Sequence, residues 1–205
     1  MDGNEQYRRA VEALREGGIV ALPTDTVYGL CAVATDDAAV RRLYDVKARH
    51  AVQPLPLFVA SVEQAELIVQ MNQPARRLGR VFWPGALTIV LPRRPAYETL
   101  AAAGGATLGV RVPDDAALRE IAAQLGPITA TSANRSGAPE TRTAAEVEAQ
   151  LGGEVDVIVD APVAPGARPS TVVDCCDPAI VRIVRKGAIG REAIVDALAG
   201  VAKLV

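Results

Sequence analysis

Short apolar segments alternate with amphipathic segments along the whole chain, and this alternation limits the fold more than any other feature of the sequence. Strands are expected at residues 19–22, 54–60, 86–91, 106–112, 128–131, 155–160, 171–174 and 180–184. Helical spacing between them predicts about six helices, the first over residues 5–16 and the last over residues 191–198. The pattern is that of an α/β fold with a twisted, mixed sheet and flanking helices. We expect a single domain over residues 5–200.

Four helix starts are predicted from side chains that can accept hydrogen bonds from the N–H groups of a first turn. These side chains are Asp36 or Asp37, Ser61 with Gln64, Asp114, and Thr143 with Glu146. The second and fourth have the spacing of a capping box, in which the two side chains satisfy backbone donors reciprocally.

Composition excludes some classes of protein. The formal net charge of −2 and the pI near 5.5 give no overall attraction to a polyanion, so a nucleotide or a nucleic acid requires a local cluster of cations. Three cysteines, two of them adjacent, suit neither a disulfide framework nor a zinc knuckle, and we interpret them as reduced structural thiols. No signal peptide and no membrane-spanning apolar run is evident, which predicts a cytoplasmic protein without membrane contact.

Polar residues follow the predicted strand 19–22. Thr24, Asp25 and Thr26 stand where open α/β sheets bind their ligands, although a turn capped by these side chains is the simpler interpretation of this segment alone. Residues 131–137 (TSANRSG) follow another strand with hydroxyls, an amide and a glycine, which suits phosphate oxygens. Walker A, GxGxxG, HExxH and GxSxG motifs are absent from the sequence.

Several cations and one aromatic residue have both a structural and a functional interpretation. Lys47 and Arg49 end a predicted helix, where a solvated cation is also stabilised by the helix dipole. His50, the only histidine, is either a general base or simply solvated. Arg111 lies inside an apolar strand and needs an anionic partner, either a ligand or an internal carboxylate. We assign Trp83 to packing at a turn.

Seven segments, taken in order, closely resemble the YrdC-like threonylcarbamoyl-AMP synthase family. They are PTDTVYGL, KAR followed by PL, WPGALTIVL, VRVP, TSANRSG, PSTVVD and VRKGAI, and they span about residues 17 to 190. The resemblance implies a YrdC-like fold with a large concave basic cavity. It also implies a nucleotidyltransferase that makes threonylcarbamoyl-AMP and pyrophosphate from L-threonine, bicarbonate and ATP, with Mg²⁺ bound to ATP, for the N6-threonylcarbamoyladenosine (t6A) modification of tRNA.

The same resemblance implies two groups of site residues. The threonine side consists of Thr26, Arg111, the backbone near Ala130, and Ser170. The ATP side consists of Lys47, Arg49, Gln53, Thr107, Ser132, Asn134 and Arg185. Lys47 and Arg49 are expected to be catalytic through charge stabilisation, and no protein ligand to a metal is expected. Expected partners are tRNA or double-stranded RNA and a downstream threonylcarbamoyl transferase complex.

Four positions depart from the family pattern as the resemblance presents it. Cys31 replaces a glycine, His50 a proline, and Phe58 and Asp115 each a histidine. Phe58 in particular removes a polar contact from the threonine side. Phe58 and Asp115 also suggest an inactive regulatory paralogue. Two further alternatives remain: a module that binds double-stranded RNA or tRNA in the basic concavity without chemistry, and a carbamoyl-transferring relative.

Overall fold

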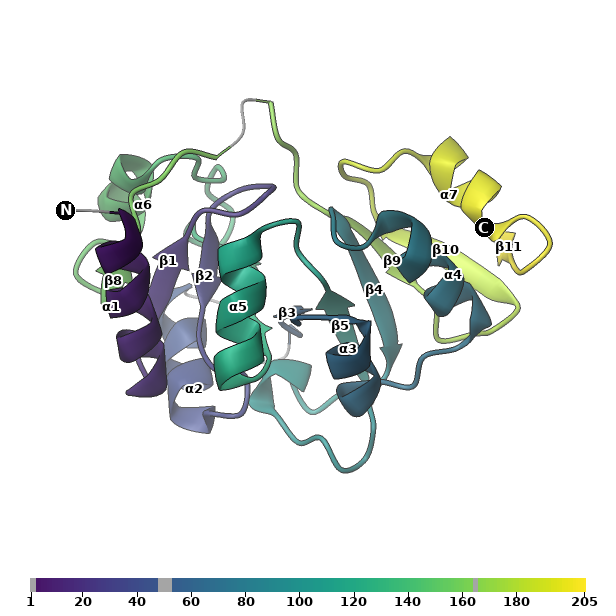
Figure 1. Ribbon diagram of the computed structural model, residues 1–205, viewed down its shortest axis with the longest axis horizontal. Helices are drawn as coiled ribbons and strands as arrows, with labels where there is room; N and C mark the ends of the chain where they lie inside the picture. The colour runs from purple at the N-terminus through teal and green to yellow at the C-terminus, as the bar shows by residue number, and fades with distance from the viewer. Residues whose placement is uncertain (1–2, 48–52, 164–165) are drawn as a thin grey trace.

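The computed structural model describes residues 3–47, 53–163 and 166–205 of the chain (Figure 1). The helices are α1 (Gly3–Arg15), α2 (Asp37–Val46), α3 (Val62–Ile68), α4 (Gln73–Phe82), α5 (Ala116–Leu125), α6 (Ala144–Leu151), α7 (Arg191–Leu198) and the 3-10 helix η1 (Leu100–Ala102). The strands are β1 (Val20–Leu22), β2 (Gly29–Cys31), β3 (Leu57–Phe58), β4 (Leu87–Pro92), β5 (Thr107–Arg111), β6 (Ile128–Thr129), β7 (Thr131–Ser132), β8 (Val157–Ile158), β9 (Thr171–Asp174), β10 (Ile180–Arg185) and β11 (Lys203–Leu204).

Hydrogen bonding divides the strands between two mixed sheets. The larger sheet has the order β11-β10-β9-β4-β5-β3-β6, and the smaller has the order β7-β2-β1-β8. Both contain parallel and antiparallel pairs; β4 lies antiparallel to β5 and parallel to β9, while β1 lies antiparallel to β2 and parallel to β8. The mixed α/β class is therefore confirmed, with the strands shared between two sheets.

The chain passes from one sheet to the other at Ala130. The predicted strand 128–131 is divided there, because β6 pairs with β3 of the large sheet and β7 pairs with β2 of the small sheet. The Ala130 N–H donates to the carbonyl of Pro56 at 2.8 Å. Thr129 ties the sheets together, since its hydroxyl accepts from the N–H of Ala32 at 2.9 Å and its own N–H donates to the Ala32 carbonyl.

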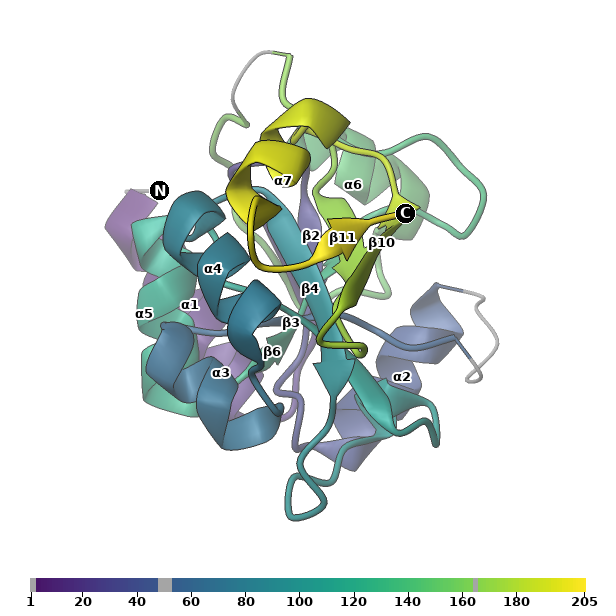
Figure 2. The same cartoon turned by 90° about the vertical axis from the view of Figure 1, so that its right-hand side faces the viewer.

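Helices cover the outer faces of both sheets. In Figure 1, α1 and α5 lie side by side against the small sheet and its junction with the large one, and their buried residues share an apolar cluster with Val20, Ile128 and Phe58. Figure 2 shows α4 and α7 packed together over the large sheet. In the described part of the chain, no helix is long and apolar enough to cross a membrane.

Most predicted helix starts are confirmed. The Asp36 carboxylate accepts from the N–H groups of Ala38 and Ala39, each at 3.0 Å, and Thr143 forms a complete capping box with Glu146. The cap predicted at Asp114 is wrong by one residue. Asp115 accepts from the Leu118 N–H at 3.0 Å, because its extended backbone directs the side chain at the first turn of α5.

Some strand lengths differ from the prediction. The apolar segment 54–60 contributes only Leu57–Phe58 to β3, because Pro54 and Pro56 have no N–H to donate to a neighbouring strand. Residues 155–160 contribute only β8. β2 and β11 were not predicted; each is too short to show a periodicity in the sequence.

Candidate functional site

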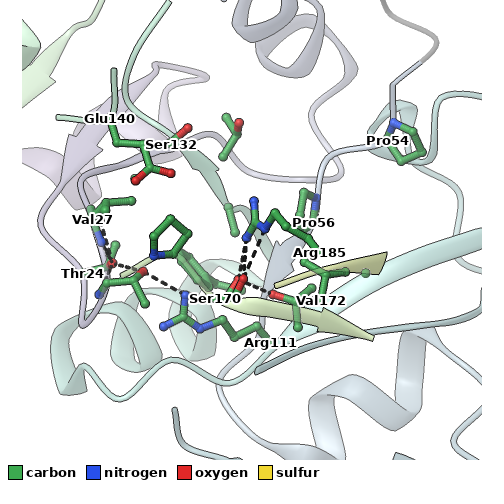
Figure 3. A pocket seen from close by; sticks show the side chains of 18 of the residues that line it. Thr24, Val27, Pro54, Pro56, Arg111, Ser132, Glu140, Ser170, Val172 and Arg185 are labelled. Carbon is green, nitrogen blue, oxygen red and sulfur yellow. Dashed lines mark hydrogen bonds between the residues drawn. The ribbon is translucent and has the colours of Figure 1, made fainter. Parts of the chain in front are cut away.

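A cavity of about 470 Å³ opens between the two sheets, close to the point where the chain changes sheet. Its walls come from the loop before β2, from β4, β5, β9 and β10, and from the segment between β7 and α6. The lining includes three cationic side chains, those of Lys47, Arg111 and Arg185, and one carboxylate, that of Glu140. Figure 3 shows Arg111, Ser170 and Arg185 gathered on one wall of this cavity.

Arg111 is buried at the end of β5 and has an internal partner. Its Nη2 donates to the Asp25 carboxylate at 2.6 Å, its Nη1 to the Thr26 hydroxyl at 3.0 Å, and its Nε to the Gly85 carbonyl at 2.9 Å. Burial lowers the pKa of Arg111, while the Asp25 charge opposes that change. The internal carboxylate left open by the sequence is therefore Asp25. A guanidinium has five N–H donors, so these three bonds leave capacity for an anion in the cavity.

The segment from Thr24 to Val27 is both a turn and a wall of the cavity. The Thr24 hydroxyl accepts from the N–H groups of Thr26 and Val27 and donates to the Val27 carbonyl at 2.7 Å. The Thr24 and Thr26 hydroxyl oxygens are 2.9 Å apart. Thr26 thus presents a fixed hydroxyl to the cavity, because the turn holds its backbone and Arg111 holds its side chain. The capped-turn interpretation and the ligand-site interpretation describe the same structure.

Ser170 and Arg185 form a second polar group on the same wall. The Arg185 Nη2 donates to the hydroxyl and to the carbonyl of Ser170, each at 2.9 Å. The Ser170 hydroxyl also lies 2.9 Å from the Thr88 hydroxyl. Burial lowers the pKa of Arg185, and the Glu140 charge opposes the change. These contacts hold the Arg185 guanidinium at the cavity wall, although the residue as a whole is exposed.

Lys47 follows α2, and the solvated helix end considered for it is wrong because the residue is only 3% exposed. Its ammonium donates to the carbonyls of Ser132 and Asn134 at 2.5 and 2.6 Å. The Asn134 amide in turn donates to the carbonyl of Ala138 at 2.7 Å. Lys47 therefore fixes the TSAN segment against the end of α2 and places a buried positive charge at the cavity.

The structure brings most of the predicted site residues together. Those that line the cavity are Thr26, Lys47, Thr107, Arg111, Ala130, Ser132, Asn134, Ser170 and Arg185. Gln53 is not among the lining residues, and its carbonyl accepts from the Tyr44 hydroxyl at 2.8 Å. Arg49 and His50 lie outside the described residues, so their predicted roles stay predictions.

The departures from the family pattern have local structural consequences. Phe58 lines the cavity, and the Arg111 guanidinium carbon lies 5.5 Å from its ring centroid, which is within the range of a cation–π contact. Cys31 is fully buried, and burial raises the pKa of its thiol. Asp115 caps α5 and is not among the cavity-lining residues. Trp83 is buried and donates to the Leu87 carbonyl at 2.7 Å, which confirms its assignment to packing.

Two polar lining residues outside the predicted loops were not assigned to the site from the sequence. Thr88 is buried within β4, and its hydroxyl oxygen lies 2.9 Å from that of Ser170. The feature of the sequence that could have indicated it is a single hydroxyl residue in the apolar segment LTIVL. Glu140 stands in the segment between β7 and α6, and no motif singled it out. In the described chain, no group of three or more histidine, cysteine, aspartate or glutamate residues is placed to bind a metal ion. One carboxylate with neighbouring hydroxyls fits a magnesium ion that is held mainly by substrate phosphates.

The Sua5_yciO_yrdC family model, described as "Telomere recombination", matches residues 12–187. The chain belongs to the Sua5/YciO/YrdC family. Threonylcarbamoyl-AMP synthase from Pyrococcus abyssi is 38% identical over 181 residues, covering 86% of this chain and 53% of that protein. Threonylcarbamoyl-AMP synthase from Bacillus subtilis is 39% identical over 193 residues, covering 92% of this chain and 55% of that protein.

A solved structure of the same fold contains an amino acid. The crystal structure of Pyrococcus abyssi Sua5 complexed with L-threonine matches with a TM-score of 0.89 and 34% identity, over 100% of this chain and 60% of that chain. The chain thus spans somewhat more than half the length of these relatives. The shared portion contains the whole cavity described above.

Proposed function

We propose that this chain is an L-threonylcarbamoyladenylate synthase, which forms threonylcarbamoyl-AMP and pyrophosphate from L-threonine, bicarbonate and ATP. The observation that carries the proposal is the convergence in one cavity of a buried arginine with unused donors, fixed hydroxyls, and further cations. Relatives with the same fold are named for this activity, and one of them was crystallised with L-threonine.

The residue chemistry suits the substrates. A carboxylate from an amino acid can share the guanidinium of Arg111 with Asp25, because charge-assisted bonds to arginine are short and directional. Thr26 and Ser170 present hydroxyls to the threonine side chain. We assign the triphosphate to Arg185 and to the TSAN segment that Lys47 holds in place, because their N–H and O–H groups can donate to phosphate oxygens.

The reaction leaves little covalent work to the protein. The amine of threonine reacts with carbon dioxide derived from bicarbonate, and an oxygen of the resulting carbamate attacks the α-phosphorus of ATP as pyrophosphate leaves. Burial raises the pKa of the Cys175 thiol to about 12, so this cysteine is unsuited to nucleophilic attack. Catalysis then rests on positioning and on charge stabilisation by Arg185, Lys47 and, from outside the described residues, Arg49. Bound Mg²⁺ would offset charge on the pyrophosphate.

The proposal extends to the use of the product. We expect the adenylate to pass to a threonylcarbamoyl transferase complex that modifies tRNA in the cytoplasm, so that tRNA is a downstream or direct partner. An RNA-binding module without chemistry would instead show steeply salt-dependent RNA affinity and no ATP turnover.

The deciding experiment measures pyrophosphate release from ATP and Mg²⁺ with and without L-threonine and bicarbonate, together with chromatography for the labelled adenylate. Release is expected only when both co-substrates are present, because the acceptor of AMP is the carbamate made from them. An Arg185→Met variant should lose most of this release, whereas Arg182→Met, which removes an exposed arginine of the same strand outside the cavity lining, should not. Release that is indifferent to threonine or bicarbonate would exclude the proposed reaction.

A further inference from the structure

Glu140 is the only carboxylate among the described residues that line the cavity. Figure 3 shows its carboxyl group directed into the cavity beside Ser132 and Val27, across from Arg185 and Ser170. Among the described residues its side chain has no hydrogen bond and no ion pair, although the residue stands at a site lined by cations.

The position of Glu140 is fixed by the next residue. Thr141 is fully buried; its carbonyl accepts from the Tyr28 N–H at 3.1 Å, and its hydroxyl donates to the Ala133 carbonyl at 2.9 Å. The first contact joins the segment after β7 to the loop before β2, and the second closes that segment onto its own first residue. The Glu140 backbone is therefore anchored beside the cavity by buried hydrogen bonds, and its exposed side chain extends from that fixed position.

The charges that surround the cavity determine how the Glu140 carboxylate would act on an entering nucleotide. The Arg111 charge is opposed by Asp25 at 2.6 Å, and the Lys47 ammonium is committed to carbonyl groups. The Arg185 cation is opposed in part by Glu140, whose charge counteracts the lowering of the Arg185 pKa by burial. A metal-free triphosphate entering this space meets Glu140 as a like charge, whereas a triphosphate carrying a divalent cation brings a positive centre to it.

We infer that Glu140 is a specificity-determining residue that makes the cavity prefer metal-bound ATP to metal-free ATP. This inference rests on the proposed function, because it requires that ATP bind in this cavity. The carboxylate repels bare phosphate oxygens and attracts the cation or its bound water, so its removal has opposite effects on the two forms of the nucleotide.

The test compares dissociation constants of the full 205-residue chain for ATP, measured by calorimetry without threonine, in excess EDTA and in excess Mg²⁺. In Glu140→Gln, affinity for metal-free ATP should rise and affinity for Mg-ATP should fall. The ratio of the two dissociation constants should then change by roughly fivefold, the size expected for one partly solvated charge pair at low salt. Glu140→Asp keeps the charge and should keep most of the preference.

Glu148→Gln is the matched control, since it removes an exposed carboxylate from α6, outside the cavity lining. Glu148→Gln should leave the ratio of the two dissociation constants unchanged. The melting temperature of Glu140→Gln should equal that of the wild type, which checks that its fold is intact. If wild-type protein binds ATP in both conditions and Glu140→Gln has the same ratio, this inference fails and the proposed function stands. If wild-type protein binds ATP in neither condition, both fail.

Discussion

Replacing Asp25 by alanine would leave the Arg111 guanidinium buried without its carboxylate. The two side chains are joined at 2.6 Å and are only 14% and 4% exposed, so solvent replaces little of the lost interaction. Removing one partner from a buried ion pair typically costs about 3–5 kcal/mol, mostly because the remaining charge is uncompensated. Arg111 keeps its bonds to Thr26 and Gly85, and we therefore expect a loss near the lower limit, about 3 kcal/mol.

The assay is urea unfolding followed by circular dichroism, with the free energy of unfolding obtained by linear extrapolation. Asp45→Ala is the control, because Asp45 is exposed on α2 and its side chain makes no ion pair among the described residues; its loss should change the free energy by less than about 0.5 kcal/mol. The double variant Asp25→Ala with Arg111→Leu removes both charges. Its loss in free energy of unfolding should be clearly smaller than the sum of the losses in Asp25→Ala and Arg111→Leu measured separately.

Two results would refute this reasoning. If Asp25→Ala were as stable as Asp45→Ala, the ion pair would contribute nothing to the free energy of unfolding. The neutral hydrogen-bond partners of Arg111 would then be sufficient for its buried charge. If the two single effects simply added in the double variant, Asp25 and Arg111 would not be coupled, despite their 2.6 Å contact.

Three further predictions address the site and the fold. Arg49→Ala should strongly reduce turnover and leave the melting temperature unchanged, because the role predicted for Arg49 is a contact to the nucleotide and single charges of this kind contribute little to stability; unchanged turnover would contradict that role. The hydrogen bond from Arg42 lowers the pKa of the Asp156 carboxyl, so its contribution to stability is present above the ordinary aspartate range and is lost as pH falls through the lowered pKa. Asp156→Asn should thus be less stable than wild type at pH 7 in thermal unfolding, and the deficit should shrink in acid; a deficit independent of pH would contradict the assignment. In the proposed site, Thr26 and Ser170 present hydroxyls to the substrate, so valine should support less pyrophosphate release than serine, within a limit of about 10⁴–10⁵ for a lost hydroxyl contact; equal rates would exclude a pocket that recognises the hydroxyl.

Several of the predicted site residues follow strand ends, whereas Lys47 follows a helix. Thr26 and Ser132 each follow a predicted apolar strand, the family resemblance implied both as site residues, and both line the cavity. Glu140 was missed because it lies in an irregular segment, and its place in the cavity depends on buried hydrogen bonds from Thr141 to Tyr28 and Ala133. Such contacts leave no periodic pattern in the sequence.

By itself, the sequence determined where most of the helices of this protein begin. Capping residues such as Asp36 and Thr143 start their helices through contacts with backbone groups two or three positions away, so the information is complete within a few residues. Only the tertiary structure decided the division of strands into two sheets at Ala130 and the choice of Asp25 as the partner of Arg111, 86 residues away. Both depend on which distant segments come into contact when the core forms. For Arg111, the buried charge requires a partner, and the packing of the chain determines which carboxylate lies close enough.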